Sequence, residues 1–152
     1  NVCAVMTADC VPVLFCDRQG SVVAAAHAGW RGLLAGVLES AVGAMQVFPG
    51  NILAWLGPAI GPACFAVGSE VRDAFVAGDP VAGLAFTPRA DGHGKWLCDI
   101  YLLARQRLQR LDITAISGGE ACTVSEGDRF FSYRRDGVTG RMASLIWLER
   151  AA

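Results

Sequence analysis

The sequence predicts a mixed α/β-type layered domain, in which apolar extended segments alternate with amphipathic helices. Hydrophobic residues make up 53% of the 152 residues and charged residues only 18%, so the chain can bury a core of its own. Segments typical of strands alternate with segments whose apolar residues recur every three or four positions. We see no internal repeat, linker or low-complexity segment, so we expect residues 1–152 to form a single domain.

The first third of the chain indicates a hairpin followed by a helix. Residues 2–17 (VCAVMTADCVPVLFCD) are expected to be buried and extended, with a break near residues 7–10. A turn at residues 18–20 leads into SVVAAAHAGW at residues 21–30, whose small and β-branched residues indicate a second strand. A helix is expected over residues 33–46. Its apolar face is formed by Leu34, Val37, Leu38, Ala41 and Met45.

The middle of the chain predicts a third strand, a loop and a second helix. NILAWLG at residues 51–57 has the apolar content of a strand, and the Gly- and Pro-rich segment after it predicts an irregular loop. Ser69 is a suitable N-cap for a helix that ends near Ala77. Residues 78–95 show no periodicity and are expected to form a loop.

The last third predicts one more helix and three strands. The helix is expected over residues 97–111, because apolar residues recur there on one face. That face is formed by Leu97, Tyr101, Ala104, Leu108 and Leu111. ITAISGG at residues 113–119 indicates a strand. Residues 122–137 and 140–150 are expected to form two further strands around a turn at residues 136–140.

Charge and hydropathy exclude several classes of partner. The formal net charge is −1 and the isoelectric point about 6.1, so no basic field exists for binding nucleic acid or an anionic membrane. No stretch reaches the roughly 20 uninterrupted apolar residues that a membrane span needs. We therefore expect neither nucleic acid nor a membrane as a partner.

The cysteines indicate the cellular compartment of the protein, and the first residues indicate whether its N-terminal part is present. The chain has six cysteines, three of them in apolar runs, which favours reduced thiols and a cytoplasmic protein over a disulfide framework. It shows no signal peptide. It begins with Asn1 and enters an apolar run at once, from which we expect that an N-terminal part is missing.

Cys10 and His27 are the first candidates for chemistry. Each lies at the end of a run of small residues, and pairing of the two strands would bring a thiolate and an imidazole together, both of them good zinc ligands. A second interpretation makes Cys10 a nucleophile activated by His27. The simplest alternative is a buried cysteine and a core histidine. Asp9 is either a general acid or base, a group that orients the metal ligands, or a turn residue.

Two arginine-containing segments are candidates for binding an anion. Arg31 and Gly32 stand at the expected start of a helix, where free N–H groups and a guanidinium suit a phosphate. The segment RFFSYRRDGVTGR combines further arginines with aromatic rings that would stack on a flat base. Its candidate residues are Arg129, Phe131, Arg134, Arg135 and Arg141. In both segments the alternative is a solvated surface.

Four segments together resemble one family. TADCVPVLF, AAAHAGWRGLLAGV, WLGPAIGPACFAVG and FFSYRRDGVTGRMASLIWL, in this order, are similar to the YfiH-like family. This family is also called the multicopper polyphenol oxidoreductase (laccase-domain) or peptidoglycan-editing-factor family. The resemblance runs from about Cys3 to Leu148. It implies an α+β fold, a layered sandwich of mixed β-sheets flanked by helices, related to a deamidating bacterial toxin with a Cys–His pair.

The resemblance also implies a metal site and an activity. In the family, the cysteine of TADC and the histidine of HAGWRG, here Cys10 and His27, are metal ligands, and a third ligand comes from an upstream QVHG-like segment that this sequence lacks. The implied metal is zinc, with copper as the alternative. Another departure is Ala66, where many relatives carry an acidic residue.

Three activities are described for such proteins. The first is a purine nucleoside phosphorylase that acts on adenosine, inosine, guanosine and methylthioadenosine, with adenosine deamination as a side activity. The second is the editing of peptidoglycan precursors, which we interpret as the reaction of a Cys–His hydrolase or amidase. The third is a copper-dependent polyphenol oxidase (laccase). Two histidines cannot build a multicopper cluster, so we favour the first, with a purine nucleoside and phosphate as partners. A non-enzymatic metal-binding module remains an alternative. The oligomeric state is left open.

Overall fold

A four-stranded sheet forms the centre of the computed structural model, which describes residues 1–91 and 93–149. Its strands, in the order β3-β2-β4-β8, are β2 (Val11–Asp17), β3 (Val23–Ala28), β4 (Ile52–Leu56) and β8 (Ala115–Gly118). Strand β2 is antiparallel to both β3 and β4, and β4 is parallel to β8. The predicted hairpin is therefore confirmed, and its register places Pro12 opposite His27.

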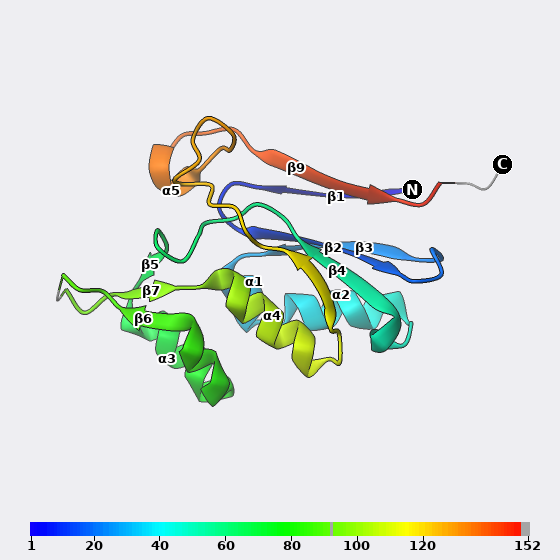
Figure 1. The fold of residues 1–152 in the computed structure, drawn as a ribbon, viewed down its shortest axis with the longest axis horizontal. Helices are drawn as coiled ribbons and strands as arrows, with labels where there is room; N and C mark the ends of the chain where they lie inside the picture. The colour runs from blue at the N-terminus through cyan, green and yellow to red at the C-terminus, as the bar shows by residue number, and fades with distance from the viewer. Residues whose placement is uncertain (92, 150–152) are drawn as a thin grey trace.

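A two-stranded ribbon covers one face of this sheet (Figure 1). It consists of β1 (Val2–Thr7) and β9 (Met142–Trp147), which pair antiparallel. The expectation that residues 2–7 are buried fails on the outer side of the ribbon, where Val2 and Met6 are more than half exposed. Strand β9 pairs with β1 at the other end of the sequence, so the predicted hairpin around residues 136–140 is wrong.

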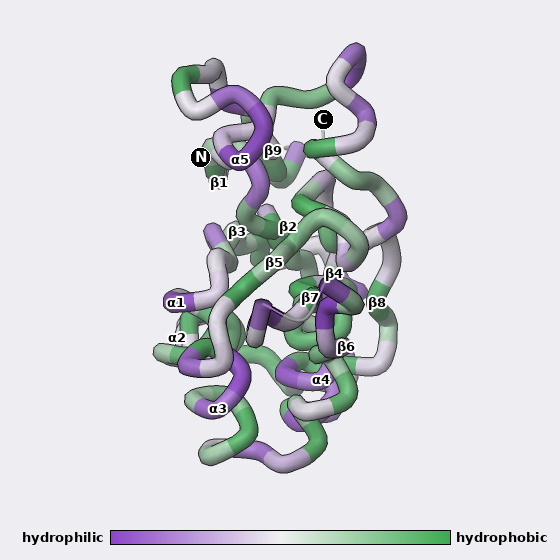
Figure 2. Tube along the Cα trace, turned by 90° about the vertical axis from the view of Figure 1, so that its left-hand side faces the viewer, coloured by the Kyte–Doolittle hydropathy of each residue, from purple (hydrophilic) through white to green (hydrophobic). Residues whose placement is uncertain are grey.

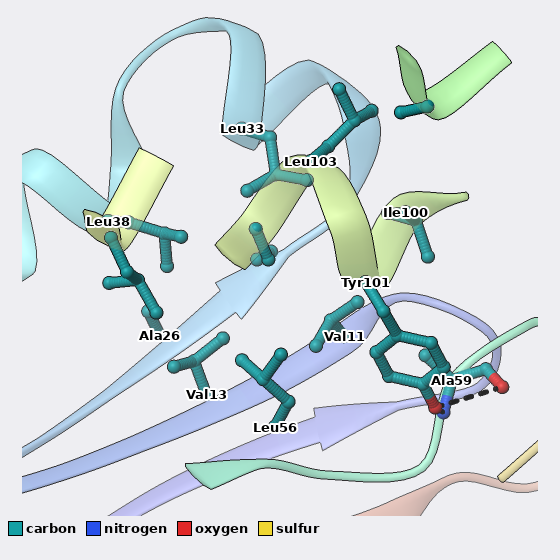
Figure 3. Packing of buried hydrophobic residues seen from close by; sticks show 14 of the residues in the cluster. Val11, Val13, Ala26, Leu33, Leu38, Leu56, Ala59, Ile100, Tyr101 and Leu103 are labelled. Carbon is teal, nitrogen blue, oxygen red and sulfur yellow. Dashed lines mark hydrogen bonds between the residues drawn. The ribbon is translucent and has the colours of Figure 1, made fainter. Parts of the chain in front are cut away.

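Helices pack against the other face (Figure 1). They are α1 (Trp30–Leu34), α2 (Val37–Met45) and α4 (Ile100–Arg110), and a short 3₁₀ helix, η1 (Pro49–Asn51), precedes β4. The single helix expected over residues 33–46 is two helices, because Gly36 has a φ of 87° and ends the first turn. Figure 3 shows how Leu33, Leu38 and Leu103 from the helices meet Val11, Val13 and Leu56 from the sheet.

Helix α4 begins three residues later than predicted. The Asp99 carboxylate caps it by accepting a hydrogen bond of 2.9 Å from the Leu102 N–H. Residues 96–98 belong to strand β7 instead. The buried face of the helix is formed by Ile100, Tyr101, Leu103, Ala104 and Leu108.

A small sheet and two helical segments complete one end of the molecule. The sheet has the order β5-β7-β6, with β5 (Ala66–Val67), β6 (Phe86–Pro88) and β7 (Trp96–Cys98). The helical segments are α3 (Ser69–Gly78) and the 3₁₀ helix η2 (Pro80–Ala85). Ser69 is the first residue of α3, and Gly68 occupies the cap position, so the predicted serine cap is wrong. The loop predicted over residues 78–95 includes η2 and β6, and residue 92 lies outside the described part.

The strand predicted over residues 122–137 is wrong. These residues form turns that end in the short helix α5 (Tyr133–Asp136), which is among the most hydrophilic segments of the chain (Figure 2). The Arg135 guanidinium donates hydrogen bonds to the carbonyls of Thr123 (2.8 Å) and Phe130 (3.0 Å). Side chain–backbone bonds of this kind replace a strand ladder and close the segment into a compact loop.

Two expectations about the whole chain concern membranes and disulfides. Among the described residues, no helix has the length and apolar character to cross a bilayer. All six cysteines lie in the described part of the chain and are unpaired there.

Candidate functional site

A cavity of about 270 Å³ lies where the β1–β2 loop, the end of β3, the segment after β4 and helix α5 meet. Much of its wall is apolar, with a few charged groups, as is usual for sites that bind small molecules. It is lined by Ala8, Asp9, Cys10, Gly29, Trp30, Arg31, Ile60, Phe65, Ile100, Tyr133 and Arg134. Four predicted site residues, Asp9, Cys10, Arg31 and Arg134, are thereby brought together from three separate parts of the sequence.

Asp9 connects three other segments near the cavity through hydrogen bonds. Its carboxylate accepts a hydrogen bond of 2.6 Å from the Thr123 hydroxyl and another of 2.6 Å from the Arg134 N–H. Its backbone has a φ of 94°, a conformation that favours glycine, and its carbonyl accepts from the Ile60 N–H at 2.9 Å. The carboxylate therefore positions the loop and helix α5, and both of its oxygens already have a partner.

Cys10 is half-buried beside Gly29, at the end of the β2–β3 pair. A Cβ on Gly29 would lie 2.8 Å from the Cys10 Sγ, so glycine is needed for the two chains to come this close. Burial, and then the charge of Asp9, raise the pKa of the Cys10 thiol, while Arg141 lowers it. These surroundings therefore favour the neutral thiol over the thiolate.

His27 lies next to the cavity but does not line it. Ala26 and Ala28 are buried against the helices, whereas His27 is exposed on the opposite face of β3. Gly29 is still extended, with φ −77° and ψ 168°, so a Gly29 Cβ would point to the same face as His27. Because that Cβ direction leads to Cys10, the thiol and the imidazole share this face.

Two arginines border the cavity, and each lies against an aromatic ring. The Arg31 guanidinium is 4.4 Å from the centre of the Trp30 ring, and that of Arg134 is 5.3 Å from the centre of the Phe65 ring. Arg134 Nη1 also donates to the Ala66 carbonyl at 3.0 Å. A guanidinium has five N–H donors, so this bond leaves donors that can hold an anion.

Three residues predicted to bind substrate lie outside the cavity wall. A Cβ on Gly32 would face the His27 carbonyl and Val37, which places this position against β3 and α2. Phe131 is 49% exposed and packs over Gly140. The Arg135 guanidinium is occupied by loop carbonyls and by Asp136, whose hydrogen bond is the largest cause that raises the pKa of Arg135. The start of α1 is also a weaker anion-binding site than expected, because this helix has only five residues.

Two buried side chains that stabilise the segments around the cavity, Thr123 and Tyr101, were not predicted as site residues from the sequence. Thr123 is fully buried and bonds Asp9 across the fold. The Tyr101 hydroxyl accepts from the Ala59 N–H at 2.6 Å (Figure 3). It also lies 3.1 Å from the Ala121 carbonyl. Burial, the largest cause, raises the pKa of Tyr101 to about 12. Neither residue belongs to a local motif, so only long-range contacts identify them.

Cys10 and His27 are the described residues to consider as ligands of a metal ion. Within residues 1–91 and 93–149, no group of three or more His, Cys, Asp and Glu side chains is placed to hold a metal ion. A cysteine and a histidine that share one face are nevertheless suitable as two ligands of a zinc ion. Cys10 and His27 thus fit part of such a site, and any third ligand must come from elsewhere.

Comparison with known proteins gives a consistent result. Residues 1–149 match a family model described as multi-copper polyphenol oxidoreductase laccase. A protein of Escherichia coli strain K12 named purine nucleoside phosphorylase YfiH is 63% identical over 148 residues, which are 97% of this chain and 60% of the relative. Its counterpart in Pseudomonas aeruginosa, named purine nucleoside phosphorylase PA4543, is 58% identical over 147 residues, with the same coverage.

Solved structures share the fold. A crystal structure of the Neisseria meningitidis protein NMB0706 has a TM-score of 0.95 and 58% identity, and the match covers 98% of this chain and 61% of that one. A Bacillus licheniformis hypothetical protein YfiH has a TM-score of 0.88 and 37% identity, with coverage of 97% and 58%. The predicted family and the α+β fold are confirmed. The chain spans about three fifths of the length of the curated relatives it matches.

Proposed function

The chain belongs to the multi-copper polyphenol oxidoreductase laccase family, and from this premise we propose that the cavity beside Cys10 is the substrate site of a purine nucleoside phosphorylase. One observation carries the proposal: two arginines and three aromatic rings border a single cavity. The names of the relatives support this activity, and because the chain spans only part of their length, the activity is proposed for the whole protein.

The size and walls of the cavity suit a nucleoside and an anion. Its volume of about 270 Å³ is near the lower end of the range for small-molecule sites, roughly 300–1,000 Å³. Trp30, Phe65 and Tyr133 offer flat faces for a purine ring. Arg31 and Arg134 supply the charged N–H donors that phosphate requires.

The reaction needs few chemical groups from the protein. A phosphate oxygen attacks C1′ of the ribose and the bond from C1′ to the base nitrogen breaks. The leaving base takes up the proton that hydrogen phosphate gives up. The products are the free base and the 1-phosphate of the sugar, which is ribose 1-phosphate for adenosine, inosine and guanosine. In this scheme, the two arginines hold phosphate next to C1′, the aromatic rings hold the base, and Asp9 keeps α5 and Arg134 in place.

Cys10 and His27 would hold zinc together with a third ligand from outside the described residues. When bound, zinc would supply Lewis-acid chemistry, which also suits the deamination of adenosine. Copper would bind the same donors, and divalent copper binds most such sites more tightly than zinc does. We expect zinc to be the functional metal.

The test is phosphate-dependent release of free base from adenosine, inosine, guanosine and methylthioadenosine by the full-length, zinc-loaded protein. Removal of one charged hydrogen bond typically costs about 1.5–3 kcal/mol, so Arg31→Ala should lower kcat/KM roughly 10- to 100-fold. Cys10→Ala should abolish turnover. Arg110→Ala is the matched control, because Arg110 is exposed and pairs with Asp79 far from the cavity. Absence of base release with every nucleoside at full zinc occupancy would refute the proposal.

The same variants separate this proposal from its rivals. If Cys10 is the nucleophile of an amidase, Cys10→Ser loses activity while removal of the metal does not. If Cys10 is a metal ligand, both treatments abolish activity. A metal-binding module without catalysis would show no turnover and would lose stability on chelation.

A further inference from the structure

Two cysteines that the proposed reaction does not use lie next in sequence to Phe65, which lines the cavity, and to Thr123, which bonds Asp9. Cys64 follows β4 in the irregular segment before β5, and Cys122 lies in the loop before α5. The Gly61 N–H donates to the Cys122 Sγ at 3.3 Å, and a Cβ on Gly61 would lie only 2.9 Å from the Cys122 Cβ. The two segments therefore approach as closely as glycine allows. Both thiols are half-buried, so solvent reaches them.

The two cysteines also lie against the same glycine. The Cys64 N–H donates to the Gly61 carbonyl at 3.0 Å, and the Gly61 N–H donates to the Cys122 Sγ. Burial is the largest cause that raises the pKa of the Cys64 thiol, and the nearby Cys122 raises it further. The thiols are thus neighbours across two loops that are 58 positions apart in sequence (122 minus 64). Proximity of this kind is the first requirement for a reversible link between two cysteines.

The surroundings of Cys122 stabilise a thiolate. Burial opposes ionisation, but hydrogen bonds from the Ser125 side chain and from the backbone N–H groups of Ser125, Gly61 and Val124 lower the pKa of Cys122 to about 7. The acidic groups that face it are Glu126, which accepts from the Cys122 N–H at 2.7 Å, and the Tyr101 phenol. A partly exposed thiolate held by N–H donors is the usual environment of a redox-sensitive cysteine.

We propose that Cys64 and Cys122 form an oxidation-sensitive dithiol, a modification site that reacts with a peroxide. The Cys122 thiolate attacks one peroxide oxygen, the O–O bond breaks, and Cys122 becomes a sulfenic acid while the other oxygen leaves as water. The Cys64 thiol then attacks the sulfenic sulfur, so the S–O bond breaks, a disulfide forms and a second water leaves. Overall, two thiols lose two electrons and one hydrogen peroxide becomes two waters.

The position of the pair connects this chemistry with the cavity. Cys64 directly precedes Phe65, a wall residue, and Cys122 directly precedes Thr123, which holds Asp9. A disulfide would therefore tie together the two loops that carry these groups. The inference is independent of the proposed function, because it concerns only the two thiols and their oxidant.

Peptide mapping after brief treatment with hydrogen peroxide tests the proposal on the wild-type protein. The expected product is a Cys64–Cys122 disulfide peptide that disappears on reduction. In Cys64→Ser, Cys122 should instead be trapped as a sulfenic acid adduct by dimedone. Cys16→Ser is the control, since Cys16 lies on β2 outside this pair, and it should form the same disulfide as the wild type.

A second measurement uses the unmodified pair and needs no variant. Alkylation of Cys122 by iodoacetamide, followed by mass spectrometry, should reach half of its maximal rate near pH 7. The proposal is overturned if peroxide yields no Cys64–Cys122 peptide from folded wild-type protein, or if Cys122 is alkylated only well above pH 8.

Discussion

Removal of the Asp9 carboxylate should destabilise the protein by an amount that the structure allows us to estimate. Asp9→Ala removes the acceptor of two hydrogen bonds, both of 2.6 Å. A hydrogen bond to a charged group contributes about 1.5–3 kcal/mol. The Thr123 hydroxyl is fully buried and would be left without this acceptor, whereas water can replace it at the exposed Arg134. We therefore expect a loss of about 2–4 kcal/mol in the free energy of unfolding.

Asp9→Asn separates charge from shape. An amide keeps one acceptor for the Thr123 hydroxyl but turns an N–H toward the Arg134 N–H, so the expected loss is smaller, about 1–2 kcal/mol. Urea unfolding followed by circular dichroism measures both values. Asp73→Ala is the control, because its ion pair with Arg72 is exposed and surface pairs contribute at most about 1 kcal/mol. The reasoning is refuted if Asp9→Ala lies within about 0.5 kcal/mol of the wild type.

Three further predictions concern single side chains. Tyr101→Phe should lower the free energy of unfolding by about 1–3 kcal/mol, since it leaves the buried Ala59 N–H without an acceptor. Tyr133→Phe alters an exposed ring and should change this free energy little. Urea unfolding of both variants measures the difference. Asp17 accepts hydrogen bonds that lower its pKa, and the largest effect comes from the Val22 N–H. The ionised Asp17 therefore stabilises the fold fully above its unfolded-state pKa of about 3.9. This stabilisation is lost as the pH falls through the lower pKa of the folded state. Asp17→Asn should accordingly reduce stability at pH 7 and flatten the acid side of the stability curve, and an unchanged acid limb would contradict this. Gly29→Ala should destabilise the protein by about 1–3 kcal/mol, because its Cβ would meet the Cys10 sulfur. Gly43→Ala in helix α2 faces open space and should stabilise the protein by up to about 1 kcal/mol. Equal effects of the two substitutions in thermal unfolding would contradict the packing argument.

Local patterns predicted the parts of the fold that local forces determine. The β2–β3 hairpin and the strand β4 followed from apolar runs bounded by turns. Helix α4 followed from its spacing of apolar residues. The break between α1 and α2 depends on one glycine, Gly36, whose positive φ has no sequence signature of its own.

Long-range contacts determined the parts that were predicted wrongly. Residues 122–137 have the apolar and aromatic content of a strand, yet they form a loop because Arg135 satisfies the loop carbonyls and Asp9 holds the start of α5. Pairing of β9 with β1 joins the two ends of the sequence, which local periodicity does not reveal.

The candidate site likewise contains some residues that local motifs predict and others whose roles depend on long-range contacts. Asp9, Cys10 and Arg31 were predicted because they stand in glycine-flanked or small-residue motifs. Of two neighbouring arginines, Arg134 borders the cavity and Arg135 supports the loop. Sequence alone assigns them the same role, because their side chains differ only in direction within a short helix.

These adjacent arginines provide the most direct test of the central claim, that the cavity beside Cys10 binds phosphate and a purine nucleoside. We would measure the KM for phosphate during base release with Arg134→Ala and Arg135→Ala, each checked for folding by circular dichroism. The account predicts that Arg134→Ala raises the KM for phosphate by about 10-fold or more, and that Arg135→Ala leaves it within about twofold while lowering thermal stability. An unchanged KM in Arg134→Ala, or a large increase in Arg135→Ala alone, would contradict the account and place the phosphate elsewhere.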